Sequence, residues 1–107
     1  AAALRDIGYH FSNKDARWKD IDSKILLRES YVLVQNKGYM LSNIDATLVL
    51  EAPKINPYVP QMIETIAEVL GIADDQVSIK ATTNETMGYV GRHEGVNAYA
   101  TCLIYKI

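Results

Sequence analysis

The sequence predicts a two-layer α/β sandwich in which helices cover one face of a sheet. Apolar and polar residues alternate over 44–50 and again over 77–82, as in half-buried strands. Between them, residues 60–70 carry apolar side chains at helical spacing. A strand–helix–strand unit of this kind implies a right-handed parallel crossover, which places the helices on one sheet face. At 107 residues the chain, 1–107, is expected to be a single domain.

Capping residues and the spacing of apolar residues predict the N-terminal elements. Residues 1–4 are alanine-rich but lack a start signal, so they are expected to be the tail of a helix that Asp6 to Gly8 stops. Residues 9–22 follow neither period and are expected to form a mobile loop. Asp22 or Ser23 then caps a helix that Gly38 ends, with Leu27, Tyr31 and Val34 on its buried face.

The remaining elements follow from the same signals. The first strand is expected to run from Ile44 to Glu51 or Ala52, because Pro53 disfavours its continuation. The helix over 60–70 begins at a proline and stops at Gly71. The last strand covers 96–107 and is apolar on both faces, so we expect a helix on one side and another subunit on the other. Within it, the single cysteine, Cys102, is expected to be a small core residue that forms no internal disulfide.

The charge balance excludes two classes of partner. Eleven Lys and Arg residues against thirteen Asp and Glu give a net charge of −2, which provides no general basic field for nucleic acid and no polybasic patch for a membrane. No apolar run reaches the ~18 residues that a membrane span requires. Any anion must therefore bind at a local site.

The chemistry is concentrated where the strand over 77–82 ends. Thr82 and Thr83 can donate to phosphate oxygens, Glu85 can hold a hard divalent cation, and Arg92 offers a planar fork for phosphate. This combination indicates a diphosphate site. The alternative is an ordinary strand end followed by a glycine-rich hairpin loop over 88–92.

Two further segments have both a binding and a purely structural interpretation. The turn through Ala52, Pro53 and Lys54 leaves backbone donors and acceptors outside the sheet, so it can bind a base edge or be an ordinary strand-to-helix loop. Asp6 and Gly8 can approach a ligand closely or form a helix C-cap.

Four motifs in order carry a family resemblance. They are Asp6-Ile7-Gly8 with Phe11 and Asp15, then Ala52-Pro53-Lys54, then Lys80 to Glu85, then Gly88 to Arg92. Over its whole length the chain thereby resembles the 2-C-methyl-D-erythritol 2,4-cyclodiphosphate synthases of the non-mevalonate isoprenoid pathway. The resemblance implies a ferredoxin-like α+β domain, a two-layer α/β sandwich with a mixed sheet. It also implies a homotrimer with its sheets facing the threefold axis and active sites between subunits. It also implies that the N-terminal third of such a protein precedes Ala1.

The resemblance assigns roles to the matching residues. Asp6, Ile7 and Gly8 would bind the hydroxyls of the methylerythritol, covered by the loop with Phe11 and Asp15, and the cytosine would be held by Ala52, Pro53 and Lys54. Thr82 and Thr83 would bind the phosphates, with Thr83 as the catalytic residue. Tyr89 and Arg92 would line an axial cavity for phosphate or an isoprenoid diphosphate. One segment departs from the family, because Asn13 stands where a carboxylate is usual.

The same resemblance implies two metals. Glu85 would hold Mg²⁺ or Mn²⁺, whereas the zinc ligands would lie in the segment before Ala1, since His10 and His93 match no family ligand. The expected enzyme is a phosphorus–oxygen lyase of the bacterial cytoplasm or a plastid-type organelle that releases CMP from a cytidine-diphosphate substrate. These 107 residues alone would be inactive. The alternative is a non-catalytic trimeric nucleotide- or anion-binding module of the same fold.

Overall fold

The computed structural model describes residues 1–107. Its helices are α1 (Ile7–His10), α2 (Ser23–Asn36), α3 (Val59–Leu70) and α4 (Gly88–Gly91), its strands are β1 (Tyr39–Val49), β2 (Val77–Thr82) and β3 (Asn97–Lys106), and single 3₁₀ turns precede α3 and β2. The three strands form one sheet in the order β2-β1-β3. The pairing of β1 is parallel to β2 and antiparallel to β3, so the sheet is mixed, as predicted.

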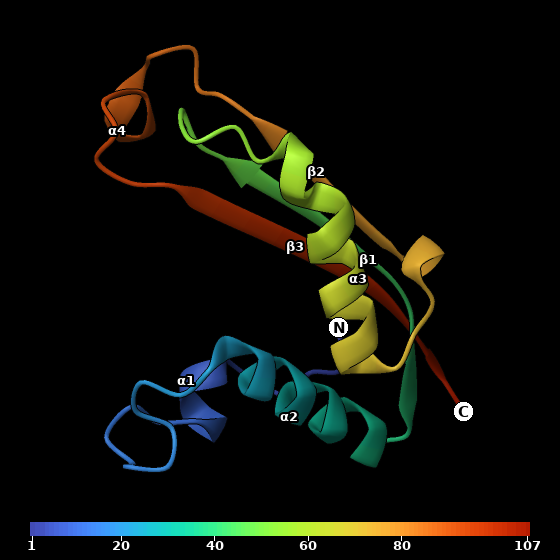
Figure 1. Ribbon diagram of the computed structural model, residues 1–107. Coiled ribbons are helices and arrows are strands. Elements are labelled where there is room, and N and C mark those ends of the chain that lie inside the picture. The colour runs from blue at the N-terminus through green and yellow to red at the C-terminus, as the bar shows by residue number, and fades with distance from the viewer.

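Helices α2 and α3 pack against the same face of the sheet (Figure 1). The buried centre is formed by Tyr31 of α2, Leu41 of β1 and Leu70 of α3. The Tyr31 hydroxyl also accepts a hydrogen bond of 3.1 Å from the Leu41 backbone N–H, which satisfies the polar end of this large side chain. The predicted two-layer arrangement with helices on one face is thereby confirmed.

The predicted caps determine where the helices begin and end. The Asp22 carboxylate accepts from the Lys24 N–H at 2.9 Å, which satisfies one free donor at the start of α2. Gly71 ends α3 in the left-handed conformation, with φ of 67°. Gly38, at φ of 93°, turns the chain from α2 into β1. These three signals are confirmed.

Two N-terminal predictions are wrong. Residues 1–6 contain no helix, because Ala3 and Arg5 have positive φ angles that a right-handed helix does not contain. The single helical turn follows instead, as α1, so Tyr9 and His10 are helical and the irregular loop begins at Phe11. Three alanines are too few to form a helix nucleus by propensity alone.

Strand β1 begins five residues before the predicted start at Ile44, and it also ends before the predicted end. It starts at Tyr39 and ends at Val49 rather than at Glu51 or Ala52. Its pairing with β3 is irregular between Leu41 and Asn43, where the register shifts. Such a bulge breaks the period of two, and so the alternation becomes readable only from Ile44 onward.

Both faces of β3 are largely open in the single chain. Tyr99, Leu103 and Tyr105, on the face away from the helices, are 61%, 59% and 52% exposed. The prediction for Cys102 is wrong: it is exposed and lines an open, apolar groove of about 260 Å³ beneath α2 instead of a closed core. An apolar surface of this kind is typical of a covered interface.

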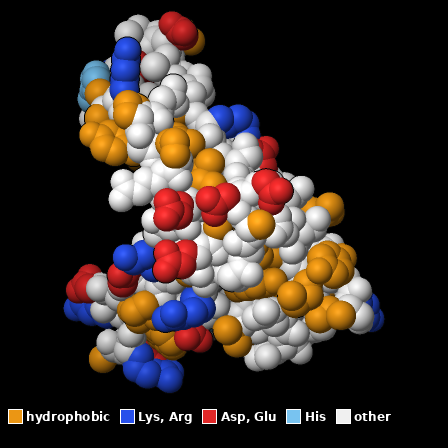
Figure 2. Space-filling view, turned by 45° about the vertical axis from the view of Figure 1, so that its right-hand side comes forward, with side chains coloured by type: hydrophobic (Ala, Val, Ile, Leu, Met, Phe, Trp, Pro, Cys, Tyr) orange, Lys and Arg blue, Asp and Glu red, His pale blue; other side chains and the backbone are white.

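The surface carries charges of both signs. Figure 2 shows acidic and basic side chains interspersed on one face, with hydrophobic side chains in separate groups. None of the helices combines the length and the apolar character needed to cross a bilayer.

Candidate functional site

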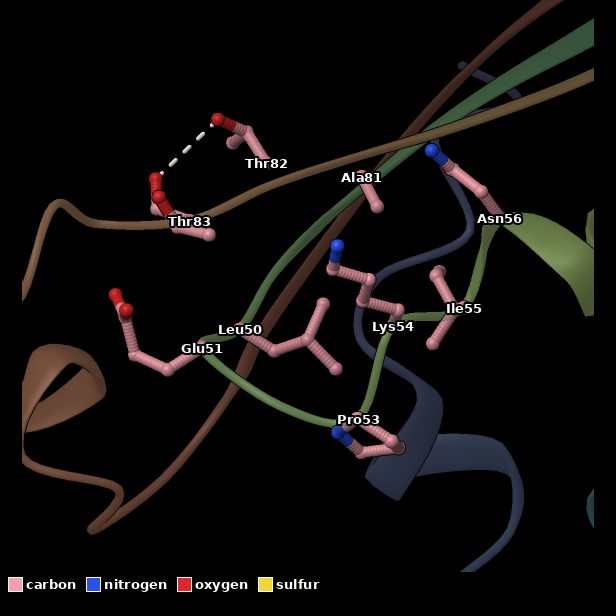
Figure 3. Close-up of a pocket in the computed structure, with 9 residues that line it drawn as sticks. All are labelled: Leu50, Glu51, Pro53, Lys54, Ile55, Asn56, Ala81, Thr82 and Thr83. Carbon is pink, nitrogen blue, oxygen red and sulfur yellow. Dashed lines mark hydrogen bonds between the residues drawn. The ribbon is translucent and has the colours of Figure 1, made fainter.

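The candidate site lies where β1 and β2 end side by side. The last ladder contact is the Leu50 N–H donating to the Thr82 carbonyl at 3.0 Å, after which the two segments diverge. The space between them is a pocket of about 260 Å³ (Figure 3). Its lining residues are Leu50, Glu51, Pro53, Lys54, Ile55, Asn56, Ala81, Thr82 and Thr83. Parallel pairing thus brings the Ala-Pro-Lys turn and the threonine pair together, although thirty residues separate them in the sequence.

The polar groups of the pocket suit an anionic ligand. The four ion pairs of the chain leave Lys54 unpaired, so its ammonium group is available for a ligand. Figure 3 shows Thr83 and Glu51 at one end of the pocket and Lys54 toward the other. The Thr83 hydroxyl oxygen accepts from the Glu85 N–H at 3.3 Å and keeps its own proton to donate. Ala52 belongs to the same turn but lines a neighbouring cavity with Val90 and His93.

Glu85 lies just beyond the pocket on an exposed turn. Glu85 and Thr86 both adopt left-handed backbone conformations, with φ of 53° and 62°. Such conformations are strained for residues with a Cβ and concentrate at functional sites. The donor set fits Mg²⁺ or Mn²⁺ in part, because these ions are commonly bound by one carboxylate together with water and substrate phosphates.

Zinc is a different case. No group of three His, Cys, Asp or Glu side chains in the chain could hold a metal ion. Because catalytic zinc requires three protein ligands, the residues present do not form a zinc site by themselves.

The segment after Glu85 is a helical turn, α4, and not the glycine-rich hairpin loop of the alternative interpretation. The Tyr89 hydroxyl donates to Asn97 Oδ1 at 2.6 Å, which ties α4 to the start of β3. The Arg92 guanidinium is held by Glu94, with contacts of 3.1–3.2 Å. A phosphate at Arg92 would therefore compete with an internal carboxylate.

The N-terminal site residues lie apart from this pocket. Asp6 precedes α1, Gly8 is within it, and Ile7 and Phe11 line a separate cavity against α2. Figure 1 shows α1 and the loop after it at the opposite end of the molecule from α4. Within one chain, the two groups of predicted site residues are not brought together.

Asp15 already has a partner within its own loop. Its carboxylate accepts from the Arg17 Nη2 at 3.0 Å and from the Arg17 backbone N–H at 3.0 Å. Hydrogen bonds from the Arg17 side chain, followed by the one from its backbone, hold the pKa of Asp15 below its ordinary value. Arg17 lies over the Trp18 ring, which packs edge-on against Phe11 with centroids 4.9 Å apart.

One residue that the sequence did not single out, Glu51, lines the pocket and bonds to the segment that follows Thr83. The Glu51 carboxylate accepts from the Asn84 backbone N–H at 2.7 Å. The signal in the sequence that could have indicated this role is its position between the end of β1 and Pro53. That position does not identify its hydrogen-bond partner, because Asn84 lies on a loop that is distant in the sequence.

The fold and the pocket together define the class of protein: an α+β domain in which two adjacent strand ends form a pocket lined by two threonines and an unpaired lysine, groups that suit an anionic ligand. The chain belongs to the YgbB family, whose model matches residues 1–105. This finding confirms the resemblance drawn from the four motifs.

Individual relatives agree. The chain is 55% identical over 106 residues to 2-C-methyl-D-erythritol 2,4-cyclodiphosphate synthase of Cytophaga hutchinsonii, covering 99% of the chain and 67% of that protein. Among solved structures it is similar to the bifunctional IspDF from Campylobacter jejuni, with a TM-score of 0.95 and 32% identity over all of this chain and 29% of that one. It is also similar to IspF of Plasmodium falciparum in complex with CDP, with a TM-score of 0.81 and 30% identity over 95% of this chain and 60% of that one.

The chain spans about two thirds of the length of the curated relatives that it matches. The names of these relatives favour the synthase over the binding-module alternative.

Proposed function

We propose that the complete protein is a 2-C-methyl-D-erythritol 2,4-cyclodiphosphate synthase, a phosphorus–oxygen lyase. Its substrate would be 4-diphosphocytidyl-2-C-methyl-D-erythritol 2-phosphate. An oxygen of the 2-phosphate attacks the β-phosphorus, the bond from that phosphorus to CMP breaks, and CMP leaves with the bonding electrons. The observation that carries the proposal is the junction of the Ala-Pro-Lys turn with the threonine pair in one pocket, in a chain whose relatives bear this enzyme's name.

The residues of the pocket would position the substrate and stabilise its charge. The 52–54 turn would hold the cytosine, and the Lys54 ammonium group would lie near the departing phosphate. The Thr83 hydroxyl would donate a hydrogen bond to an oxygen of the reacting phosphoryl group, where negative charge develops. Thr82 would bind a phosphate oxygen in place of its present bond to the Thr83 carbonyl. Because the attack is intramolecular, correct placement of the two phosphates supplies much of the acceleration.

The proposed cofactors are zinc and Mg²⁺ or Mn²⁺. A divalent cation would neutralise phosphate charge when bound, and Glu85 is the carboxylate of this chain that would hold it. Zinc would need ligands beyond those present here, from the additional third that the relatives possess. On this proposal a polypeptide of these 107 residues alone does not turn over.

The proposed assembly is a homotrimer with active sites between subunits. Two features support it: the exposed apolar face of β3, and the separation of the Asp6–Asp15 segment from the pocket within one chain. A neighbouring subunit could supply the missing half to each site. The Tyr89 and Arg92 region would line an axial cavity for phosphate or an isoprenoid diphosphate. The bacterial sources of its relatives support a location in the bacterial cytoplasm.

The decisive experiment is an assay of the protein encoded by the complete gene, with Zn²⁺ and Mg²⁺. CMP should appear together with the cyclic diphosphate, detected by phosphorus NMR. A non-catalytic binding module would bind CDP and release nothing. Light scattering of the same sample should give three subunits, and a monomer at micromolar concentration would contradict the trimer.

A further inference from the structure

Glu51 connects the two segments that form the pocket. It is the first residue after the ladder between β1 and β2 ends, and its side chain reaches across to accept from the Asn84 N–H at 2.7 Å. A hydrogen bond from a backbone N–H to a carboxylate is stronger than one between neutral groups. The bond therefore joins the 52–54 turn to the threonine segment beyond the point where backbone pairing stops.

The segment that Glu51 holds is strained, and Glu51 joins it to the 52–54 turn. Glu85 and Thr86 are both left-handed. Three hydrogen bonds lie within residues 84–87: Asn84 Nδ2 to the Met87 carbonyl at 2.8 Å, the Met87 N–H to the Asn84 carbonyl at 3.0 Å, and the Thr86 hydroxyl to the Glu85 carbonyl at 2.6 Å. These internal bonds preserve the shape of the turn, and the Gly91 N–H joins it to α4 by donating to the Met87 carbonyl at 3.0 Å. The bond to Glu51 is the one that links the turn to the 52–54 segment. Strained backbone persists when surrounding contacts hold it.

Glu51 is not used for charge pairing. It takes part in none of the four ion pairs, although Lys54 lies three residues away and lines the same pocket. Its Oε1 accepts instead from the Asn84 backbone N–H. Figure 3 shows the Glu51 side chain extending toward the Thr83 segment and away from Lys54. The bond thus sets the distance between the nucleotide-binding turn and the hydroxyl of Thr83.

We propose that Glu51 is a positioning residue for the reaction: through the Asn84 N–H it fixes the Thr83 hydroxyl and the Glu85 carboxylate relative to the 52–54 turn. This inference rests on the proposed function. What the position requires is a side-chain acceptor of this length, and the negative charge is secondary. Glutamine should therefore replace Glu51, whereas methionine, of similar size but without an oxygen acceptor, should not.

The test uses Glu51→Gln and Glu51→Met in the protein encoded by the complete gene, with Glu64→Met on the exposed face of α3 as the matched control. Glu51→Met should lower kcat about thirtyfold, since misplacement of a reacting group by ~1 Å can cost up to about a hundredfold. Glu51→Gln should stay within about threefold of wild type, because its amide oxygen still accepts. CMP affinity, measured by calorimetry, should change less than about twofold in both variants.

A second measurement does not depend on catalysis. Hydrogen exchange of the Asn84 amide should be slow in wild type and in Glu51→Gln, and fast in Glu51→Met. If the wild type releases no CMP but this pattern is found, the proposed enzyme fails while the positioning bond stands. Wild-type kcat in Glu51→Met would overturn the inference, as would an equal loss in both variants, which would indicate that the charge itself is required. Should Glu51→Met not fold, Glu51→Ala with the same amide measurement decides.

Discussion

The two groups of predicted site residues differ in how the fold holds them. Pro53, Lys54, Thr82 and Thr83 come from distant parts of the sequence and meet because parallel strands place their carboxyl ends at one edge. The Asp6–Asp15 segment is local, and two of its polar side chains already have near neighbours as partners: His10 bonds to the Leu4 carbonyl and Asp15 to Arg17. The first group forms a pocket within one chain. The second lies apart from that pocket within one chain.

The sharpest test of the first region is Thr83→Ala. Removing a hydroxyl directed at the reacting phosphate should lower kcat about a hundredfold, or by ~3 kcal/mol, because one preorganised donor is lost. CMP affinity should barely change, since the 52–54 turn holds the base. Steady-state kinetics of CMP release and calorimetry measure the two effects, and Thr83→Ser, which keeps the hydroxyl, is the control. Weakened CMP binding at an unchanged rate would make the threonine pair a binding platform.

Gly91→Ala tests whether the turn beyond Thr83 is held by packing. A Cβ at Gly91 would lie 2.0 Å from the Thr86 carbonyl carbon, so the backbone must move. We expect a loss of about 2 kcal/mol in the free energy of unfolding, typical of overpacking. Gly95→Ala is the control, because its Cβ would meet the Tyr89 ring at an ordinary 3.4 Å. Chemical denaturation gives both values, and equal stability in the two variants would contradict the expectation.

A smaller effect is expected for Glu85→Gln. A neutral amide is a weaker ligand than a carboxylate for a hard cation, so the Mg²⁺ or Mn²⁺ concentration at half-maximal rate should rise about tenfold. The maximal rate at saturating metal should be largely recovered. Titration of the rate with each metal measures this, with Glu64→Gln as control. An unchanged metal requirement would remove Glu85 from the metal site.

The smallest effect is expected for Arg17→Gln, which tests the Asp6–Asp15 segment. Hydrogen bonds from Arg17 depress the pKa of Asp15, so their loss should raise that pKa toward its ordinary value. Because the depressed group contributes stability above its unfolded pKa, wild type and variant should differ at neutral pH. The difference should vanish as the pH falls through the folded pKa of Asp15. NMR titration of the Asp15 carboxyl measures the shift, with Lys19→Gln as control, and an Asp15 pKa that does not move would separate it from Arg17.

The sequence predicted most of the fold because its signals are local. The Asp22 cap, the helix face around Tyr31 and the stop at Gly71 each depend on residues within a turn or two. The early start of β1 was missed because the shift between Leu41 and Asn43 breaks the alternation. The turn Ile7–His10 was missed because its conformation depends on contacts outside the segment, not on the helix propensity of the alanines before it.

By itself, the sequence determined the family and the two-layer α+β class, and it named Thr82 and Thr83 as candidate phosphate-binding residues, since these depend on residue types in order. Only the tertiary structure decided which of them share a pocket, that Asp15 and Arg92 have internal partners, and that Glu51 spans the two strand ends. The physical reason is that a side chain's partner is set by distance in space. Parallel pairing makes neighbours of Glu51 and Asn84, whose separation in the chain conceals their contact.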